Sequence, residues 1–496
     1  MRRVLIANRG EIAVRVIRAC QAMGLQSVAV YSEADADAPH VAAADIAVPI
    51  GPPAASASYL NSAVILEAAR RTRADAIHPG YGFLSENADF ARACQSAGVI
   101  FVGPPAAVIE QMGSKTAARK TVSAAGVPVV PGQVPASQSD ASIAAAVHAV
   151  GFPALLKASA GGGGKGMRLA TSPDRLTEAI GSARRESERA FGDGTLYVER
   201  SIDPARHIEV QILGDRDGSV VHLFERDCSL QRRHQKVIEE APAPDLSPAV
   251  RERLTRAAVD AARAVGYVNA GTIEFLLQGE GDAAEFYFLE MNTRLQVEHP
   301  ITEAVTGVDL VQAQLRIAGG EPLPFRQDDL ALNGHAIECR IYAEDSVRLL
   351  PQSGRLLRYR EPAGVRVDSG VREGQAITGH YDPMLAKVIA HDVDRETALD
   401  RLAEALRQYE ILGVRHNIAF LLALLTRDEV RRHRGQVGTR FIERHFDELA
   451  TRPSEALVRA AASAAAMIGA RGPALVNASG SRSAFDPWQT LGSVTW

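Results

Sequence analysis

Two apolar segments of the sequence each contain a glutamate where a core residue is expected. Glu274 lies within residues 271–277 and Glu290 within residues 286–292, and both segments predict strands. A carboxylate buried in such a strand needs a cation or an arginine partner. Because side chains alternate along a strand, Glu290 and Asn292 share one face. Oxygen ligands from neighbouring strands suit Mg²⁺ with nucleotide phosphates, so we predict a metal site; two structural ion pairs are the alternative.

A run of four glycines, residues 161–164, separates two short predicted strands. A P-loop requires Ser or Thr after its lysine and then a helix, but here Gly166 follows Lys165 and a strand comes next. The run therefore predicts a hairpin flap whose backbone N–H groups close over phosphates, with Lys157 and Lys165 as positive charges at its ends. A flexible connector is the alternative.

A cation, an amide and a carboxylate directly follow the second acidic strand, at Arg294, Gln296 and Glu298. Arginine offers a planar fork to a small oxyanion, and glutamate offers a base. Residues 226–236 are also rich in hydrogen-bond donors, which predicts either part of an anion site or a solvated basic face. The absence of adjacent aromatic residues argues against base stacking with nucleic acid.

The elements that must position these residues begin with alternating strands and helices in the first 113 residues. This alternation predicts a parallel sheet with helices on its faces. The turn at residues 8–10 lacks the glycine spacing of a dinucleotide site, so no NAD is predicted. The polar loop 78–87 follows a strand and opens a helix, a common ligand position in such sheets. The strands expected here are 4–7, 27–31, 74–78 and 99–102, and the helices are 11–23 and 86–97.

The pattern changes near residue 114 and again near residue 331. The middle region carries the flap and the acidic strands. The third region predicts further short strands and finishes on helices, and the tail from 447 has the small polar composition of a linker. We expect strands at 336–342, 354–359 and 385–390 and helices at 395–409 and 417–425.

Composition limits the possible functions. A net charge of −4 on 496 residues gives no basic surface for nucleic acid, and no apolar run approaches the roughly 20 residues of a membrane span. The four cysteines are far apart in sequence and form no paired motif. The N-terminal apolar run is too short for a signal peptide, so a cytoplasmic location is expected.

Taken together, five motifs resemble the biotin carboxylase component of biotin-dependent carboxylases, within the ATP-grasp superfamily. They occur in family order as HPGYGFLSEN, KASAGGGGKGM, ERDCSLQRRHQKVIEEAPAP, EMNTRLQVEHPITE and GHAIECRIYAED. The resemblance covers residues 1 to about 446. It implies an α/β and α+β multidomain fold: a Rossmann-like N-terminal domain (1–113), an ATP-grasp domain (114–330) with a mobile lid at about 130–200, and a mixed C-terminal domain (331–446), followed by the tail (447–496).

The resemblance also implies a role for each matching position. The ATP-binding positions are Lys115, Lys157, Gly162, Gly163, Gly164, Lys165, Gly166, Glu199, His207, Gln231 and His234, with Glu199 beginning the hinge that meets adenine. The metal ligands, for Mg²⁺ or Mn²⁺, are Glu274, Glu290 and Asn292. Bicarbonate is held by Lys236, Arg294, Gln296 and Val297, with Glu298 as the general base. Arg340 stabilises the enolate of biotin, and Tyr81 and Asp382 lie on loops near biotin.

The implied activity is carboxylation of biotin with ATP and bicarbonate through carboxyphosphate. The implied partners are a biotin carboxyl carrier, a carboxyltransferase subunit and a second copy of the chain or a larger assembly, in an acyl-CoA carboxylase. Other bicarbonate-phosphorylating ATP-grasp ligases and a non-catalytic nucleotide-binding scaffold are the alternatives. Ala160 replaces a common glycine at the start of the flap, and Arg200 and Ile202 depart from the usual hinge.

Lysine occurs at only six positions: 115, 120, 157, 165, 236 and 387. Four of them fall on the flap or on implied phosphate and bicarbonate positions, whereas Lys120 and Lys387 have no role that the sequence supports. Because no lysine follows Lys387, where a carrier would have its biotin attachment site, we expect the carrier to act in trans.

Overall fold

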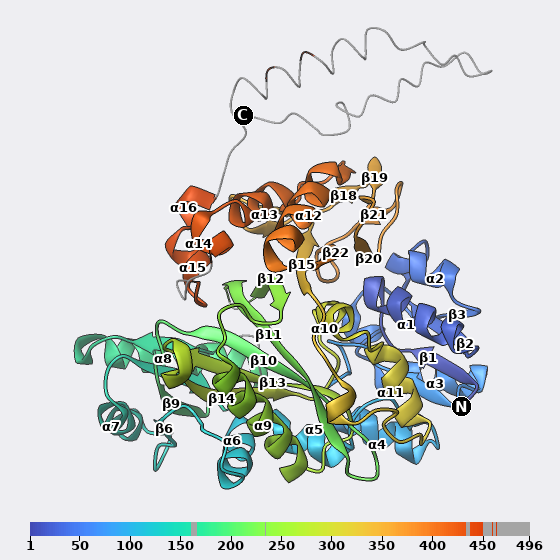
Figure 1. Ribbon diagram of the computed structural model, residues 1–496. Helices are drawn as coiled ribbons and strands as arrows, with labels where there is room; N and C mark the ends of the chain where they lie inside the picture. Colours follow the sequence, from blue (N-terminus) through green and yellow to red (C-terminus); the bar gives the residue numbers. More distant parts are fainter. Residues whose placement is uncertain (160–165, 234, 433–436, 450–458, 460–462, 464–496) are drawn as a thin grey trace, which may run out of the picture.

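The computed structural model describes residues 1–159, 166–233, 235–432 and 437–449, together with 459 and 463. Its N-terminal part is a five-stranded parallel sheet in the order β3-β2-β1-β4-β5, which confirms the predicted fold class. The apolar strand residues are buried beneath helices (Figure 1). The elements are β1 (Arg3–Ile6), α1 (Gly10–Ala22), β2 (Gln26–Tyr31), α2 (Pro39–Ala43), β3 (Ile46–Pro49), α3 (Ser62–Thr72), β4 (Ala76–His78), α4 (Ala88–Ser96), β5 (Ile100–Phe101) and α5 (Ala106–Gly113).

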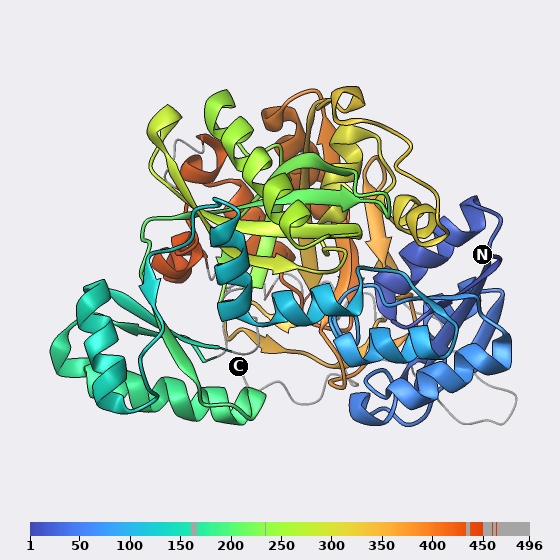
Figure 2. The same ribbon diagram turned by 90° about the horizontal axis from the view of Figure 1, so that it is seen from below.

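A separate four-stranded antiparallel sheet in the order β6-β9-β7-β8 forms the lid, which we define as residues 132–200. In Figure 2 it projects from the rest of the molecule, drawn in teal. Its own small core includes Leu156, Ile180 and Val198. The expected strand at 154–158 is confirmed as β7. The helix α6 (Lys115–Ala124) precedes the lid in sequence. The lid consists of β6 (Gly132–Gln133), α7 (Asp140–Val150), β7 (Ala154–Ala158), β8 (Arg168–Ala170), α8 (Leu176–Phe191) and β9 (Leu196–Arg200).

The central element is an eight-stranded antiparallel sheet in the order β14-β13-β10-β11-β12-β15-β22-β20. Strands from both sides of position 330 belong to it, because β12 pairs directly with β15. The part formed by β10 and β13 packs on α9 (Pro248–Ala264). The part formed by β15 and β22 packs on α12 (Arg395–Gln408). The strands are β10 (Arg206–Gly214), β11 (Val220–Arg232), β12 (Gln235–Ala241), β13 (Asn269–Gln278), β14 (Glu285–Asn292), β15 (His335–Tyr342), β20 (Arg366–Ser369) and β22 (Met384–Asp392).

The remaining elements surround this sheet. The prediction of a single strand at 354–359 is wrong, because the segment forms two short strands with different partners. The first, β18 (Gly354–Arg355), pairs with β21 (Ala376–Ile377), and the second, β19 (Arg358–Arg360), pairs with β23 (Glu410–Leu412). Between them, the side chain of Leu356 is buried in the core. No helix among the described residues is long and apolar enough to cross a membrane. The elements are α9 (Pro248–Ala264), α10 (His299–Thr306), α11 (Leu310–Ala318), β16 (Glu344–Asp345), β17 (Leu350–Pro351), β18 (Gly354–Arg355), β19 (Arg358–Arg360), β21 (Ala376–Ile377), α12 (Arg395–Gln408), β23 (Glu410–Leu412), α13 (Ile418–Leu425), α14 (Asp428–Arg432), α15 (Phe441–Arg444) and α16 (Phe446–Leu449).

Candidate active site

A cavity of about 620 Å³ is lined by the loops and the first helix that follow strands of the parallel sheet, by the lid, by the central sheet and by residues of the C-terminal part. This size suits a small-molecule site. The structure thereby brings together residues from Asn8 to Met384, which are 376 positions apart in sequence. The predicted site residues on its wall are Tyr81, Lys115, Lys157, His207, Gln231, Lys236, Glu274, Glu290, Asn292, Arg294, Gln296, Val297, Arg340 and Asp382.

Gly166, Glu199 and Glu298 are described by the structure but do not line this cavity. Gly162, Gly163, Gly164, Lys165 and His234 fall outside the described residues, so their roles stay predictions.

Two ATP-site predictions can be located within the lid. Gly166 adopts a φ of +71°, and a Cβ added there would lie 3.0 Å from the Cβ of Ala158, so this end of the flap requires glycine. The carboxylate of Glu199 lies 2.8 Å from the Lys157 ammonium and 2.5 Å from the Arg119 guanidinium. This side chain therefore orders one cation of the lid and one of α6, and its implied place at the adenine hinge stays a prediction.

The three predicted metal ligands lie on adjacent strands in matching register. Glu274 of β13 is opposite Glu290 of β14, and Thr272 is opposite Asn292. Within the described part of the chain, Glu290 has no hydrogen bond or ion pair, although it lines the cavity. Two carboxylates and an amide oxygen facing a cavity form the hard-oxygen donor set that Mg²⁺ prefers.

The two glutamates have opposite electrostatic environments. Burial raises the pKa of Glu290, and the neighbouring Glu274 raises it further. Burial would also raise the pKa of Glu274, but Lys236 and His207 outweigh this effect and hold it well below its ordinary value. A divalent cation beside Glu290 would offset both the burial and the repulsion between the carboxylates.

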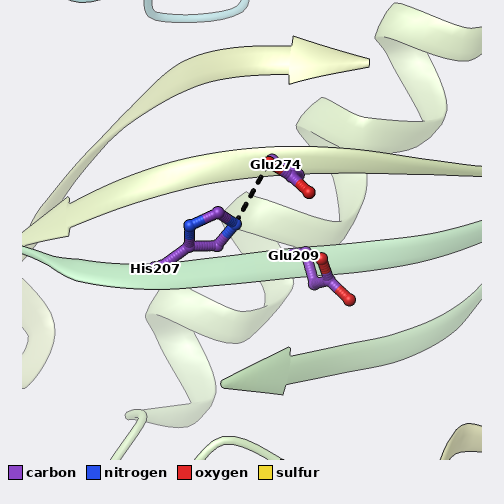
Figure 3. Close-up of side chains that lie close together, drawn as sticks. All are labelled: His207, Glu209 and Glu274. Atoms are coloured by element: carbon purple, nitrogen blue, oxygen red, sulfur yellow. Dashed lines mark ion pairs between the residues drawn. The ribbon is translucent and has the colours of Figure 1, made fainter. Parts of the chain in front are cut away.

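His207 and Glu209 occupy alternate positions on β10 and therefore lie on the same face (Figure 3). His207 Nε2 is 3.2 Å from Glu274, the ion pair drawn in Figure 3. Glu209 is neutralised by two side chains: Lys236 Nζ lies 2.5 Å from one oxygen, and Arg226 donates to the other. These two cations balance the charge of Glu209 in this arrangement.

Lys236 joins the metal donors to the predicted base. Its ammonium lies 2.9 Å from Glu274 and 2.6 Å from Glu298. The other Glu298 oxygen accepts a hydrogen bond from Arg340 at 3.0 Å, and Arg340 Nε donates to Glu239 at 2.6 Å. Glu298 is completely buried and does not itself line the cavity, but Lys236 and Arg340, the two cations that hold it, do.

These cations set the basicity of Glu298. Burial would raise the pKa of its carboxyl, but Lys236 and Arg340 outweigh burial and hold the pKa well below the ordinary value. The group is therefore ionised and weakly basic in this arrangement. An anion that entered the cavity would share both cations, which would raise the pKa of Glu298 and make it a better proton acceptor.

Arg294 approaches the same region from the other side. It donates to Glu86 at 2.9 Å, to Gln296 Oε1 at 2.9 Å and to Asn292 Oδ1 at 3.0 Å. We call Arg294, Gln296 and Glu298 the anion cluster. The Arg294 guanidinium links this cluster to the predicted metal ligands, as its position between Asn292 and Gln296 in the sequence suggests.

Sequence reasoning missed several charges that complete the site. Five are buried, Glu11, Glu209, Arg226, Glu239 and Lys387, and the sixth is the exposed Glu86, which pairs with Arg294. A signal existed for Glu209, because polar residues at 207, 209 and 211 alternate with apolar ones, the pattern of a strand with a polar face. The other missed residues could not be predicted, because their roles depend on contacts with segments far away in the sequence.

Replacing Glu290 by Gln is expected to raise the Mg²⁺ concentration needed for half-maximal ATP cleavage by at least about tenfold, since even outer partners of a metal ligand contribute that much. A Mg²⁺ titration of ATP cleavage measures this effect. Glu285→Gln at the exposed start of the same strand is the matched control and should leave the titration unchanged. An unchanged midpoint in Glu290→Gln would remove this residue from the ligand set.

Three family models match the chain in succession. They are described as biotin carboxylase, N-terminal domain, over residues 1–109; carbamoyl-phosphate synthase L chain, ATP binding domain, over residues 114–326; and biotin carboxylase C-terminal domain, over residues 338–444. Together with the oxygen-donor set and the cation-held carboxylate, they define the chain as an ATP-dependent ligase.

Relatives narrow this class. The chain is 50% identical over 447 residues to the biotin carboxylase of Halalkalibacterium halodurans, covering 90% of this chain and 98% of the relative. It is 51% identical to the mitochondrial methylcrotonoyl-CoA carboxylase subunit alpha of Oryza sativa, covering 92% of this chain but only 62% of that relative. The chain belongs to the biotin carboxylase family.

Solved structures agree. The biotin carboxylase domain dimer of the Hydrogenobacter thermophilus 2-oxoglutarate carboxylase, in complex with MgADP, ADP and bicarbonate, is 44% identical with a TM-score of 0.87, covering 91% of this chain and 99% of that one. A Campylobacter jejuni biotin carboxylase complex is 43% identical with a TM-score of 0.86, covering 90% and 99%.

Proposed function

We propose that this protein uses ATP and bicarbonate to carboxylate the ureido nitrogen of biotin. The observation that carries the proposal is the position of Lys236, within 3 Å of both Glu274 of the metal set and Glu298 of the anion cluster. This contact supports a phosphate-binding region and a base that act beside one cavity.

The residues support the following order of events. Arg294 and Lys236 hold bicarbonate, and Glu298 accepts its proton. The bicarbonate oxygen then attacks the γ-phosphorus of ATP, ADP leaves, and carboxyphosphate forms. Glu274, Glu290 and Asn292 would hold Mg²⁺, which neutralises charge on the transferred phosphoryl group.

Carboxyphosphate is labile, so the site must exclude water until CO₂ is released beside biotin. The lid supports this role because Lys157 of β7 lines the cavity from the lid side. Arg340 is placed to stabilise the negative charge on the ureido oxygen of biotin, an assistance that is worth ~3 kcal/mol per donor in comparable sites. Tyr81 and Asp382, on the wall of the same cavity, mark the proposed biotin end.

The proposed partners follow from the family. A carrier protein presents biotin, and a carboxyltransferase receives the carboxyl group; a homodimer or larger assembly and a cytoplasmic location are further predictions. Since the chain spans about 62% of the length of the methylcrotonoyl-CoA carboxylase subunit that it matches, membership of an acyl-CoA carboxylase is likewise a proposal.

We propose that the chain is organised in three units followed by a linker. The units are residues 1–113, residues 114–330 with the lid, and residues 331–446, and the linker is 447–496.

The test measures ADP formation in CO₂-depleted buffer with and without added bicarbonate, free biotin or ammonia. We expect ATP cleavage that requires bicarbonate and accelerates with biotin, with label from bicarbonate appearing in carboxybiotin. Acceleration by ammonia rather than biotin would favour a carbamoyl-phosphate type of ligase, to which the model matching residues 114–326 also belongs. Cleavage indifferent to bicarbonate and biotin would refute the proposal.

A further inference from the structure

Lys387 is a completely buried lysine in the middle of β22. Its ammonium donates a hydrogen bond of 2.7 Å to the backbone carbonyl of Val297. Two carboxylates lie nearby, with Glu11 at 3.4 Å and Asp368 at 3.9 Å. A buried ammonium requires such partners, because an unpaired charge in the interior is strongly unfavourable.

The carbonyl that Lys387 holds belongs to the peptide that joins Val297 to Glu298. Fixing this peptide plane fixes the backbone from which the Glu298 side chain departs, at the start of α10 (φ −80°, ψ 11°). Glu298 therefore has two independent restraints: Lys387 acts on its preceding peptide, and Arg340 and Lys236 act on its carboxylate.

The sheet explains why these restraints act together. Arg340 of β15 is directly opposite Lys387 of β22, and Asp368 of β20 is opposite Lys387 on the other side. Residues opposite each other in a sheet point to the same face. The other face of the same strands is apolar, with Cys339 and Val388 in the core against α12.

We infer that Lys387 is a positioning residue for the base Glu298, held mainly by Glu11 of the N-terminal unit at 3.4 Å, with Asp368 of the C-terminal unit further away at 3.9 Å. This inference rests on the proposed function, in which Glu298 accepts the proton of bicarbonate. Lys387 does not line the cavity and acts only through the Val297–Glu298 peptide. Its other charged neighbours are Glu338 and Arg366, neither of which contacts that peptide.

A purely structural role for Lys387 makes a different prediction. If the ammonium served only to neutralise buried carboxylates, removing any member of the cluster would lower stability without a selective effect on turnover. If it positions Glu298, its loss lowers kcat for bicarbonate-dependent ATP cleavage while KM for ATP stays unchanged. Misplacement of a reacting group by about 1 Å costs roughly 10²-fold.

The experiment compares Lys387→Met with Asp368→Asn, which removes a charge from the same cluster but does not touch Val297. Thermal unfolding, KM for ATP and kcat are measured for both, in the presence of bicarbonate and without biotin. We expect both variants to lose stability, and only Lys387→Met to lose kcat, by roughly 10²-fold. Equal kcat values in the two variants would overturn the inference.

Two further measurements keep the result interpretable. If Lys387→Met does not fold, Glu11→Gln removes the nearest counter-charge without changing shape, and a several-fold loss of kcat at unchanged KM for ATP is expected; no loss would overturn the inference. If the unaltered protein shows no bicarbonate-dependent cleavage, the proposed function fails. If it does and the variants match it, only the positioning role fails.

Discussion

Glu298→Gln is expected to abolish carboxylation of biotin while ATP still binds. The substitution keeps the shape and one oxygen that accepts from Arg340, but it removes the only carboxylate that contacts both Lys236 and Arg340 among the described residues. Loss of a positioned base costs roughly 10²–10⁴-fold. Transfer of labelled bicarbonate to free biotin measures the rate, and calorimetric titration with ADP measures nucleotide binding.

The matched control is Glu225→Gln. Glu225 is also buried and is paired with Arg251 at 2.9 Å, but Arg251 does not line the cavity, whereas Lys236 and Arg340, the partners of Glu298, do. This variant should lose some stability and keep the ratio of carboxylation to ATP binding. Full carboxylation activity in Glu298→Gln would exclude Glu298 as the base.

Lys236→Met is expected to impair bicarbonate use and folding together. Its ammonium lies within 3 Å of Glu209, Glu274 and Glu298, so the variant leaves buried carboxylates without their shared cation. Breaking a buried ion pair by removing one partner costs about 3–5 kcal/mol. Loss of a charge that both binds the anion and tunes the base should reduce kcat/KM for bicarbonate by at least about 10²-fold.

The stability loss in Lys236→Met should depend on pH. In the unaltered protein the pKa values of Glu274 and Glu298 are held below ordinary, so these groups contribute stability at neutral pH that is lost as the pH falls through their depressed pKa values. Without Lys236, burial raises both pKa values, so the deficit of the variant is greatest at neutral and higher pH and shrinks on acidification.

Chemical unfolding of Lys236→Met at several pH values measures this deficit. Lys120→Met is the control, because Lys120 is an exposed lysine on α6 and its loss should change the free energy of unfolding by less than about 0.5 kcal/mol. A deficit that is equal at all pH values would contradict the assigned charge pairing.

Much of this site could be predicted because its residues are concentrated in continuous motifs. The two acidic strands could be predicted because each contains a glutamate within a run of apolar residues. They form as β13 and β14 at the expected residues. The short edge strand β3 escaped prediction because only four residues form it and proline ends it. Lys387 and Glu11 also escaped, because their partners lie far away in sequence and no local period links them.

The pairing of β12 with β15 has a consequence for dissecting the protein. Position 330 separates the proposed ATP-grasp and C-terminal units in sequence, yet the hydrogen bonds between these two strands join them into one sheet. A fragment ending at 330 would expose the seven-residue β12 as a free edge, and the complementary fragment would expose β15. Free edges of this length promote self-association, so truncations at this junction should aggregate rather than yield two independently stable pieces.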